Sequence, residues 1–149
     1  MKVRMLFAAL LGGALSASPA AAEPPAVFIT HLYAQYKDMD HWAKNFDPCA
    51  EYCEADLGTL IKAARRKNMI GYDPICQCQH GGEKYMMFMG ATGVNDSEYR
   101  ATMVKMGGPP GQWTLILHWV DGGWKVHDVM EKIAGKQVSL RQRLAAAAS

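Results

Sequence analysis

The sequence lacks a surplus of charge of either sign. Its 149 residues contain 16 lysines and arginines against 14 aspartates and glutamates. Lys2 and Arg4 lie in an N-terminal stretch that we expect to be removed, so the mature chain is formally neutral. Nucleic acids and anionic membranes attract proteins through excess lysine and arginine, so neither is expected as a partner.

The sequence also lacks an apolar run long enough to span a membrane. The run from Met5 to Leu15 is shorter than the roughly 20 residues that a transmembrane helix needs. Two basic residues precede it and small residues ending at Ala22 follow it, which is typical of a secretory signal peptide. We therefore expect a signal peptide over residues 1–22, cleavage after Ala22, and a periplasmic or secreted protein without a membrane anchor. Residues 23–149 have the size of one domain.

Motifs of common catalytic centres are missing as well. The four cysteines occur in "DPCAEYC" (47–53) and "DPICQCQH" (73–80), and neither contains the Cys-x-x-Cys of thiol oxidoreductases. No phosphate-binding loop, Ser-His-Asp order or paired-carboxylate pattern stands out. We expect no cofactor, and a protein that is not an enzyme is the preferred interpretation.

The cysteines are expected to form disulfides, because an exported chain meets an oxidising compartment. Cys49 and Cys53 share one face of a predicted helix, and Cys76 and Cys78 share one face of an extended segment. A Cys-x-Cys bridge closes a strained small ring, so we expect the bridges to join helix to strand, in either of two pairings. Each would close a loop of about 25 residues and stabilise the fold by roughly 3 kcal/mol.

The segment around Cys76 has a second interpretation. Cys76, Cys78 and His80 alternate, so on a strand all three face one way, and thiolate with imidazole suits zinc or copper. The spacing is not that of a zinc finger, and oxidation would consume the thiols. A soft-metal site is therefore the lesser alternative.

The first half of the chain predicts helices and the second half predicts strands. Asp47 is a suitable N-cap and Pro48 suits the first position of a helix. Asp121-Gly122 between two apolar segments is a strong hairpin signal. We expect helices over 26–36, 38–46 and 47–68, strands over 83–92, 97–106, 112–120 and 123–129, and a last strand turn or short helix after Ser139. This order predicts an α+β fold, with the N-terminal helices packed on a curved antiparallel sheet.

A family resemblance rests on the "DPICQCQ" junction and on a meander ending in "GWKVHDV" and "SLRQRL". With the helices before them, these segments resemble the nuclear-transport-factor-2-like (cystatin-like) cone fold. Over roughly residues 26–144 the chain resembles an exported bacterial family known as domain of unknown function 3828, although His80 stands where an acidic residue is expected. The resemblance implies a cone of helices over a bent sheet and implies no activity, since such folds host isomerases, dehydratases, binding modules and immunity proteins.

A cone of this kind encloses a pocket between helices and sheet. Tyr36, Trp42, Tyr85 and Asp128 are the candidate ligand-binding residues. A two-residue hairpin turn places His118 opposite Lys125 and on one face with His127. Asp128 then lies on the other face, among apolar side chains that include Leu115, Leu117 and Val126.

Asp128 supports two interpretations. An acid among apolar side chains has a raised pKa and can act as a general base, which would make the protein an isomerase- or dehydratase-like enzyme. The favoured interpretation is a hydrogen-bonded structural carboxylate, as buried polar groups normally are.

The preferred function is therefore an exported, non-catalytic binding module of the inhibitor or immunity type. Its partner would be a protein or small molecule of the cell envelope. A homodimer that pairs through an exposed sheet face, with Trp113 or Trp119 outward, is a further expectation.

Overall fold

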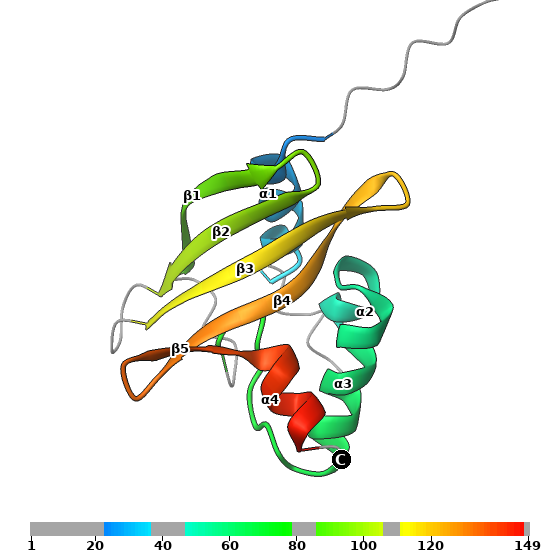
Figure 1. Ribbon diagram of the computed structural model, residues 1–149, viewed down its shortest axis with the longest axis vertical. Helices are drawn as coiled ribbons and strands as arrows, with labels where there is room; N and C mark the ends of the chain where they lie inside the picture. Colours follow the sequence, from blue (N-terminus) through cyan, green and yellow to red (C-terminus); the bar gives the residue numbers. More distant parts are fainter. Residues whose placement is uncertain (1–22, 37–46, 79–85, 106–110, 148–149) are drawn as a thin grey trace, which may run out of the picture.

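The computed structural model describes residues 23–36, 47–78, 86–105 and 111–147 (Figure 1). The predicted helix over 38–46 lies outside these residues. The described elements are α1 (Pro25–Ala34), α2 (Pro48–Tyr52), α3 (Ala55–Arg66), β1 (Met86–Asn95), β2 (Glu98–Lys105), β3 (Gly111–Val120), β4 (Gly123–Ile133), β5 (Lys136–Ser139) and α4 (Leu140–Ala146). Within this part of the chain, no helix is long and apolar enough to cross a membrane.

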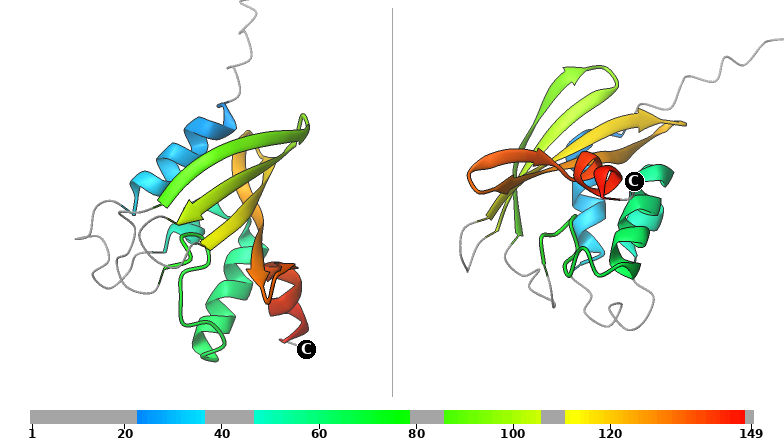
Figure 2. Two further views of the ribbon diagram at one scale, coloured as in Figure 1. Left: turned by 90° about the vertical axis from the view of Figure 1, so that its left-hand side faces the viewer. Right: turned by 60° about the horizontal axis from the view of Figure 1, so that its bottom comes forward.

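The five strands form one antiparallel sheet in the order β1-β2-β3-β4-β5. The sheet is curved, as the two turned views in Figure 2 show. Helix α1 packs against β1 and β2, α2 and α4 pack against β4, and α3 packs against α4. The predicted α+β class, with helices before an antiparallel meander, is confirmed. The sequence predicted four strands, and the structure adds the short strand β5. After β5 the tail forms the short helix α4, which was one of the two alternatives expected after Ser139.

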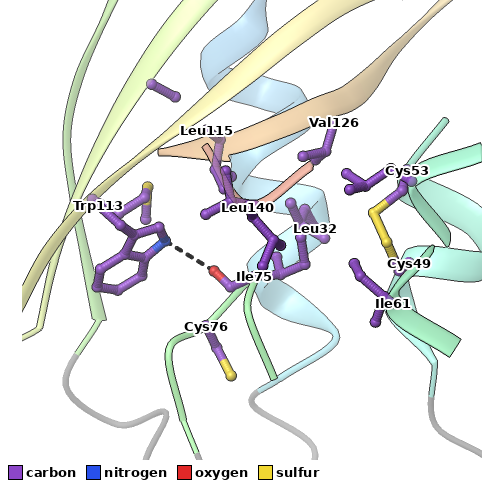
Figure 3. Close-up of a cluster of buried hydrophobic side chains, with 14 of the residues drawn as sticks. Leu32, Cys49, Cys53, Ile61, Ile75, Cys76, Trp113, Leu115, Val126 and Leu140 are labelled. Atoms are coloured by element: carbon purple, nitrogen blue, oxygen red, sulfur yellow. Dashed lines mark hydrogen bonds between the residues drawn. A yellow bond between two sulfur atoms is a disulfide. The ribbon is translucent and has the colours of Figure 1, made fainter. Parts of the chain in front are cut away.

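Side chains fill the space between the helices and the sheet (Figure 3). Trp113 is 1% exposed and donates a hydrogen bond of 3.0 Å from Nε1 to the carbonyl oxygen of Ile75. Of the two tryptophans expected to face outward, Trp113 does not, because it shares the inner face of β3 with the buried Leu115 and Leu117, and Trp119 is partly buried against the core. The core residues come from the four helices, from β2, β3 and β4, and from the segment between α3 and β1. They include Leu32, Leu57, Ile61, Ile75, Val126 and Leu140.

The β3–β4 hairpin has the predicted turn. Val120 pairs with Gly123 and His118 pairs with Lys125, and both Asp121 (φ 50°) and Gly122 (φ 82°) adopt the positive φ that a two-residue hairpin loop of this type requires.

The predicted register fails beyond Val126, because a β-bulge at His127 adds one residue to β4. Ile116 therefore pairs with Asp128, and Leu115 pairs with Val129. A one-residue shift exchanges the faces of all following side chains. Asp128 consequently leaves the face that carries Leu115 and Leu117, which corrects the predicted apolar surroundings.

The predicted helix 47–68 is broken into α2 and α3. Cys53 is extended (φ −97°, ψ 161°), and Cys53 and Glu54 lie along β4, where the Glu54 amide donates 3.0 Å to the carbonyl oxygen of Val126. Strand β5 pairs only with Met130–Ile133, so the earlier part of β4 has backbone groups that the linker satisfies. This nonlocal pairing outweighs the helical pattern of the sequence.

The disulfides join Cys49 to Cys53 and Cys76 to Cys78, with Cα atoms 4.7 and 5.2 Å apart. The expected helix-to-strand pairing is wrong for two local reasons. Helix α2 ends before Cys53, and Cys76 and Cys78 flank Gln77 in a turn with φ 52° rather than lying on a strand. Each bridge therefore fixes a local turn of the chain.

Loss of either bridge is expected to cost about 2 kcal/mol, because the chain-entropy contribution of so short a loop is small. The Cys76→Ser/Cys78→Ser variant should keep the near-UV circular dichroism of the native core and lose this amount of unfolding free energy in urea. Peptide mapping under non-reducing conditions checks the pairing directly. A peptide that links residue 49 or 53 to residue 76 or 78 would contradict it.

Candidate functional site

The candidate site lies on the face of β3 and β4 that is turned away from the core. The hairpin register and the bulge bring His118 and His127 together there. Their rings stack with centroids 3.8 Å apart and an interplanar angle of 17°. The prediction that these two histidines share a face is confirmed.

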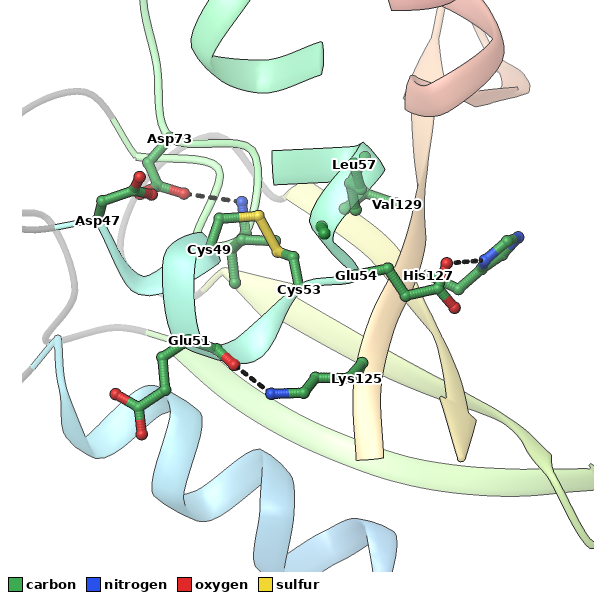
Figure 4. Close-up of a disulfide and its surroundings, with 12 residues drawn as sticks. Asp47, Cys49, Glu51, Cys53, Glu54, Leu57, Asp73, Lys125, His127 and Val129 are labelled. Atoms are coloured by element: carbon green, nitrogen blue, oxygen red, sulfur yellow. Dashed lines mark hydrogen bonds and ion pairs between the residues drawn. A yellow bond between two sulfur atoms is a disulfide. The ribbon is translucent and has the colours of Figure 1, made fainter. Parts of the chain in front are cut away.

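Glu54, the residue before α3, contacts both rings, and Figure 4 shows its carboxylate beside the ring of His127. Its Oε1 is 3.1 Å from Nδ1 of His118 and its Oε2 is 2.9 Å from Nδ1 of His127. A carboxylate oxygen and an imidazole lone pair repel each other, so each of these contacts requires a proton or a cation between the two atoms. The three side chains are 18–32% exposed, so solvent reaches the cluster.

Arg141 of α4 borders the cluster. Its guanidinium donates to Glu54 Oε2 at 3.0 Å and, through Nε and Nη2, to the carbonyl oxygen of His127 at 2.9 and 2.7 Å. It also forms a two-pronged ion pair with Asp56 in the first turn of α3. The hydrogen bond from Arg141 lowers the pKa of Asp56. Arg141 thus fastens α4 to the start of α3 beside the histidines.

Asp128 has a structural position at the start of α4. Its Oδ1 accepts from the amides of Val129 and Arg141 at 2.8 and 2.9 Å, and its Oδ2 accepts from the Ser139 hydroxyl at 2.5 Å. The residue is 8% exposed. Both oxygens hold backbone or side-chain donors of the β5–α4 junction, which agrees with the favoured interpretation. The catalytic role of Asp128 stays a prediction.

Two further buried acids hold the segment between α3 and β1 in place. The carboxylate of Asp73 accepts from the Ile75 amide at 2.9 Å and faces Arg65 at 3.4 Å, and burial raises the pKa of Asp73. Glu131 accepts from the Tyr72 hydroxyl at 2.5 Å and from Arg143 at 2.7 Å. Burial, followed by the hydrogen bond to Glu131, raises the pKa of Tyr72 to about 12. The contacts of each acid therefore hold this segment in place.

The predicted ligand-binding residues do not meet at one described pocket. Tyr36 is fully buried in the core, and Trp42 and Tyr85 lie outside the described residues. One pocket has a volume of about 390 Å³. It is lined by Gln77, Gly111, Gln112, Trp113, Lys132 and Gly135. Neither Tyr36 nor Asp128 lines it, and the predicted aromatic wall stays a prediction.

The predicted soft-metal set loses its thiolates. Cys76 and Cys78 are bonded to each other, and a disulfide offers no thiolate to a metal ion. His80 lies outside the described residues.

Glu54 is the site residue that the sequence analysis missed. Within a predicted single helix over 47–68, nothing distinguished Glu54 from its neighbours. The helix is interrupted at Glu54 only because this part of the chain pairs with β4. The usable signal was the hairpin: its register already placed His118 and His127 together.

Comparisons with known proteins indicate the fold alone. No family model matches the chain, and no curated protein matches it. A solved structure that is similar is a chain of the type VI native effector–immunity complex Tae3–Tai3 from Ralstonia pickettii. The similarity has a TM-score of 0.54 at 16% sequence identity, and it covers 76% of this chain and 98% of that chain.

Proposed function

We propose that this chain is an exported, non-catalytic binding protein of the immunity type, whose partner is a protein toxin that acts in the cell envelope. The observation that carries the proposal is the similarity to a chain of an effector–immunity complex, which extends over 98% of that chain. At 16% identity the likeness concerns the fold, so the partner is inferred as a class.

The interior of the domain supports binding rather than catalysis. Side chains fill the space between helices and sheet, and the buried acids Asp73, Asp128 and Glu131 each accept structural hydrogen bonds. The signal-peptide pattern of residues 1–22 would deliver the chain to the compartment of such a toxin. Membership of the exported family named above is part of the same proposal.

The surface that we propose for the partner is β1. This strand lies at one end of the sheet, and within the described residues no other strand pairs with its outer side. Its ten residues, "MMFMGATGVN", carry no charge, and Met89 and Val94 are 60% and 49% exposed. Natural edge strands are usually protected by charges, proline or a short length. An uncharged edge of this length suits a partner that adds a strand or packs on it.

The proposal is tested in co-culture. A deletion strain is grown with parental cells that deliver type VI effectors, and its survival is compared with that of strains carrying the full chain or Met89→Lys. We expect at least tenfold loss of the deletion strain, rescue by the full chain, and no rescue by Met89→Lys, because a buried unpaired charge at an interface is costly. Ile133→Lys is the matched control, since Ile133 is an exposed apolar residue (44%) of β4.

Equal survival of the deletion and parental strains would overturn the immunity role. Rescue by Met89→Lys at the level of the full chain would overturn the assignment to β1 and leave the immunity role standing. Circular dichroism of both lysine variants ensures that each is folded.

A further inference from the structure

Glu54, His118 and His127 form the one group of three metal-ligating side chains that converges within the described residues. One potential ligand atom from each lies within 4.8 Å of the others. Two imidazoles and one carboxylate are a ligand set of open zinc sites, in which water takes the fourth position. We infer that these three residues bind a divalent transition-metal ion of the zinc class.

The distances between the ligand atoms suit such an ion. In a tetrahedral site with bonds of about 2.0–2.1 Å, neighbouring ligand atoms lie about 3.3 Å apart. Nδ1 of His118 and of His127 lie 3.1 and 2.9 Å from the two oxygens of Glu54. One ligand atom from each residue lies within 4.8 Å of the others, so rotation of the side chains brings the three to this spacing, and the ion then replaces the protons that these contacts otherwise require.

The stacked rings hold both nitrogens on the same side. The hairpin fixes the backbone of both residues, and because imidazole lone pairs lie in the ring plane, the nearly parallel rings must rotate about their side-chain bonds to point both nitrogens at one ion. Each of the two histidine side chains is about one-third exposed, so a hydrated ion can reach their nitrogens and keep a water ligand. The backbone of these two ligands is therefore fixed before the ion binds, and only their side chains turn to reach it.

Neighbouring cations do not prevent binding. Arg141 donates from Nη2 to Glu54 Oε2 and approaches Nδ1 of His127 at 3.4 Å, while its Nε and Nη1 hold the His127 carbonyl oxygen and Asp56 without Glu54. The ammonium group of Lys125 donates to the carbonyl oxygen of Glu51 and points away from His127 (Figure 4). The ion thus takes Glu54 from Arg141, while Arg141 keeps its other contacts.

The ion would connect three separate parts of the chain: the α2–α3 junction, β3 and β4. Binding to the folded state alone stabilises that state in proportion to the logarithm of ion concentration. The inferred site is thus a metal-dependent fastening of the helices to the sheet, and it is separate from β1.

The test uses the untagged, oxidised chain of residues 23–149, stripped with chelator and titrated with Zn²⁺ alone by calorimetry. We expect one ion per chain and a rise of about 5 °C or more in the unfolding midpoint at a hundredfold excess over the dissociation constant. Glu54→Gln and His127→Asn should each weaken binding by about tenfold to hundredfold or more.

His31→Asn is the matched control, because Nδ1 of His31 lies 2.9 Å from Glu23 Oε1 in an exposed pair without a second imidazole. It should bind Zn²⁺ as the unchanged chain does. Circular dichroism verifies that each variant is folded, and His118→Asn repeats the test on a different strand. Failure of the folded chain to bind Zn²⁺, or binding unaffected by folded Glu54, His118 and His127 variants, would overturn the inference.

Discussion

Replacement of Trp113 by alanine is expected to lower the free energy of unfolding by about 3–5 kcal/mol, the cost of removing a large aromatic side chain from a packed core. Trp113 is 1% exposed, and its Nε1 donates to the Ile75 carbonyl oxygen, so it ties β3 to the 72–78 segment as well as filling space. Urea unfolding followed by circular dichroism measures the loss. We expect a lower midpoint without a change in the slope of the transition.

Two variants separate the contributions of Trp113. Trp113→Phe keeps most of the apolar volume and leaves the buried Ile75 carbonyl oxygen without this donor, which should cost about 1–2 kcal/mol. Trp119→Ala removes a tryptophan that is only partly buried beside Trp124, so its effect should be smaller than that of Trp113→Ala. A loss at Trp119 equal to that at Trp113 would contradict the described core.

Replacement of Asp128 by alanine is expected to cost about 3 kcal/mol, because it leaves the buried donors of the β5–α4 junction without their acceptor. These donors are the amides of Val129 and Arg141 and the Ser139 hydroxyl. Helix α4 should loosen first, which hydrogen exchange of its amides would detect as faster exchange than in β3.

Asp128→Asn distinguishes the structural role from a catalytic one. Asparagine retains a side-chain oxygen for the two amides, and the Ser139 hydroxyl, which already accepts from the Gln142 amide, can accept from the new side-chain nitrogen. We therefore expect most of the stability to return. A stable, fully folded Asp128→Asn protein that loses a measurable isomerase or dehydratase activity would contradict the non-catalytic proposal.

Local chemistry made much of the fold predictable. Pro48 at the first position of α2 and the Asp121-Gly122 turn each act over a few residues. The α+β class and the pairing of His118 with Lys125 followed from them. The candidate site was predictable in part for the same reason, because two of its three residues lie on one hairpin.

Several of the errors concern β4, above all the part of it that β5 does not cover. The linker at Cys53 and Glu54 pairs there, which ends α2, brings Glu54 to the histidines and leaves Cys49 and Cys53 to bond each other. The bulge at His127 then turns Asp128 away from the face of Leu115 and Leu117. A helical pattern in the sequence contains no information on which distant strand has unpaired backbone groups.

By itself, the sequence determined the α+β class and the hairpin that brings the histidines together, since these depend on composition and on short-range backbone preferences, and export of the chain stays a prediction. Only the tertiary structure decided the break between α2 and α3, the bonding of Cys49 to Cys53 and the place of Glu54. Those depend on hydrogen bonds between segments some 70 residues apart, and such bonds form where the folded sheet leaves donors and acceptors unsatisfied.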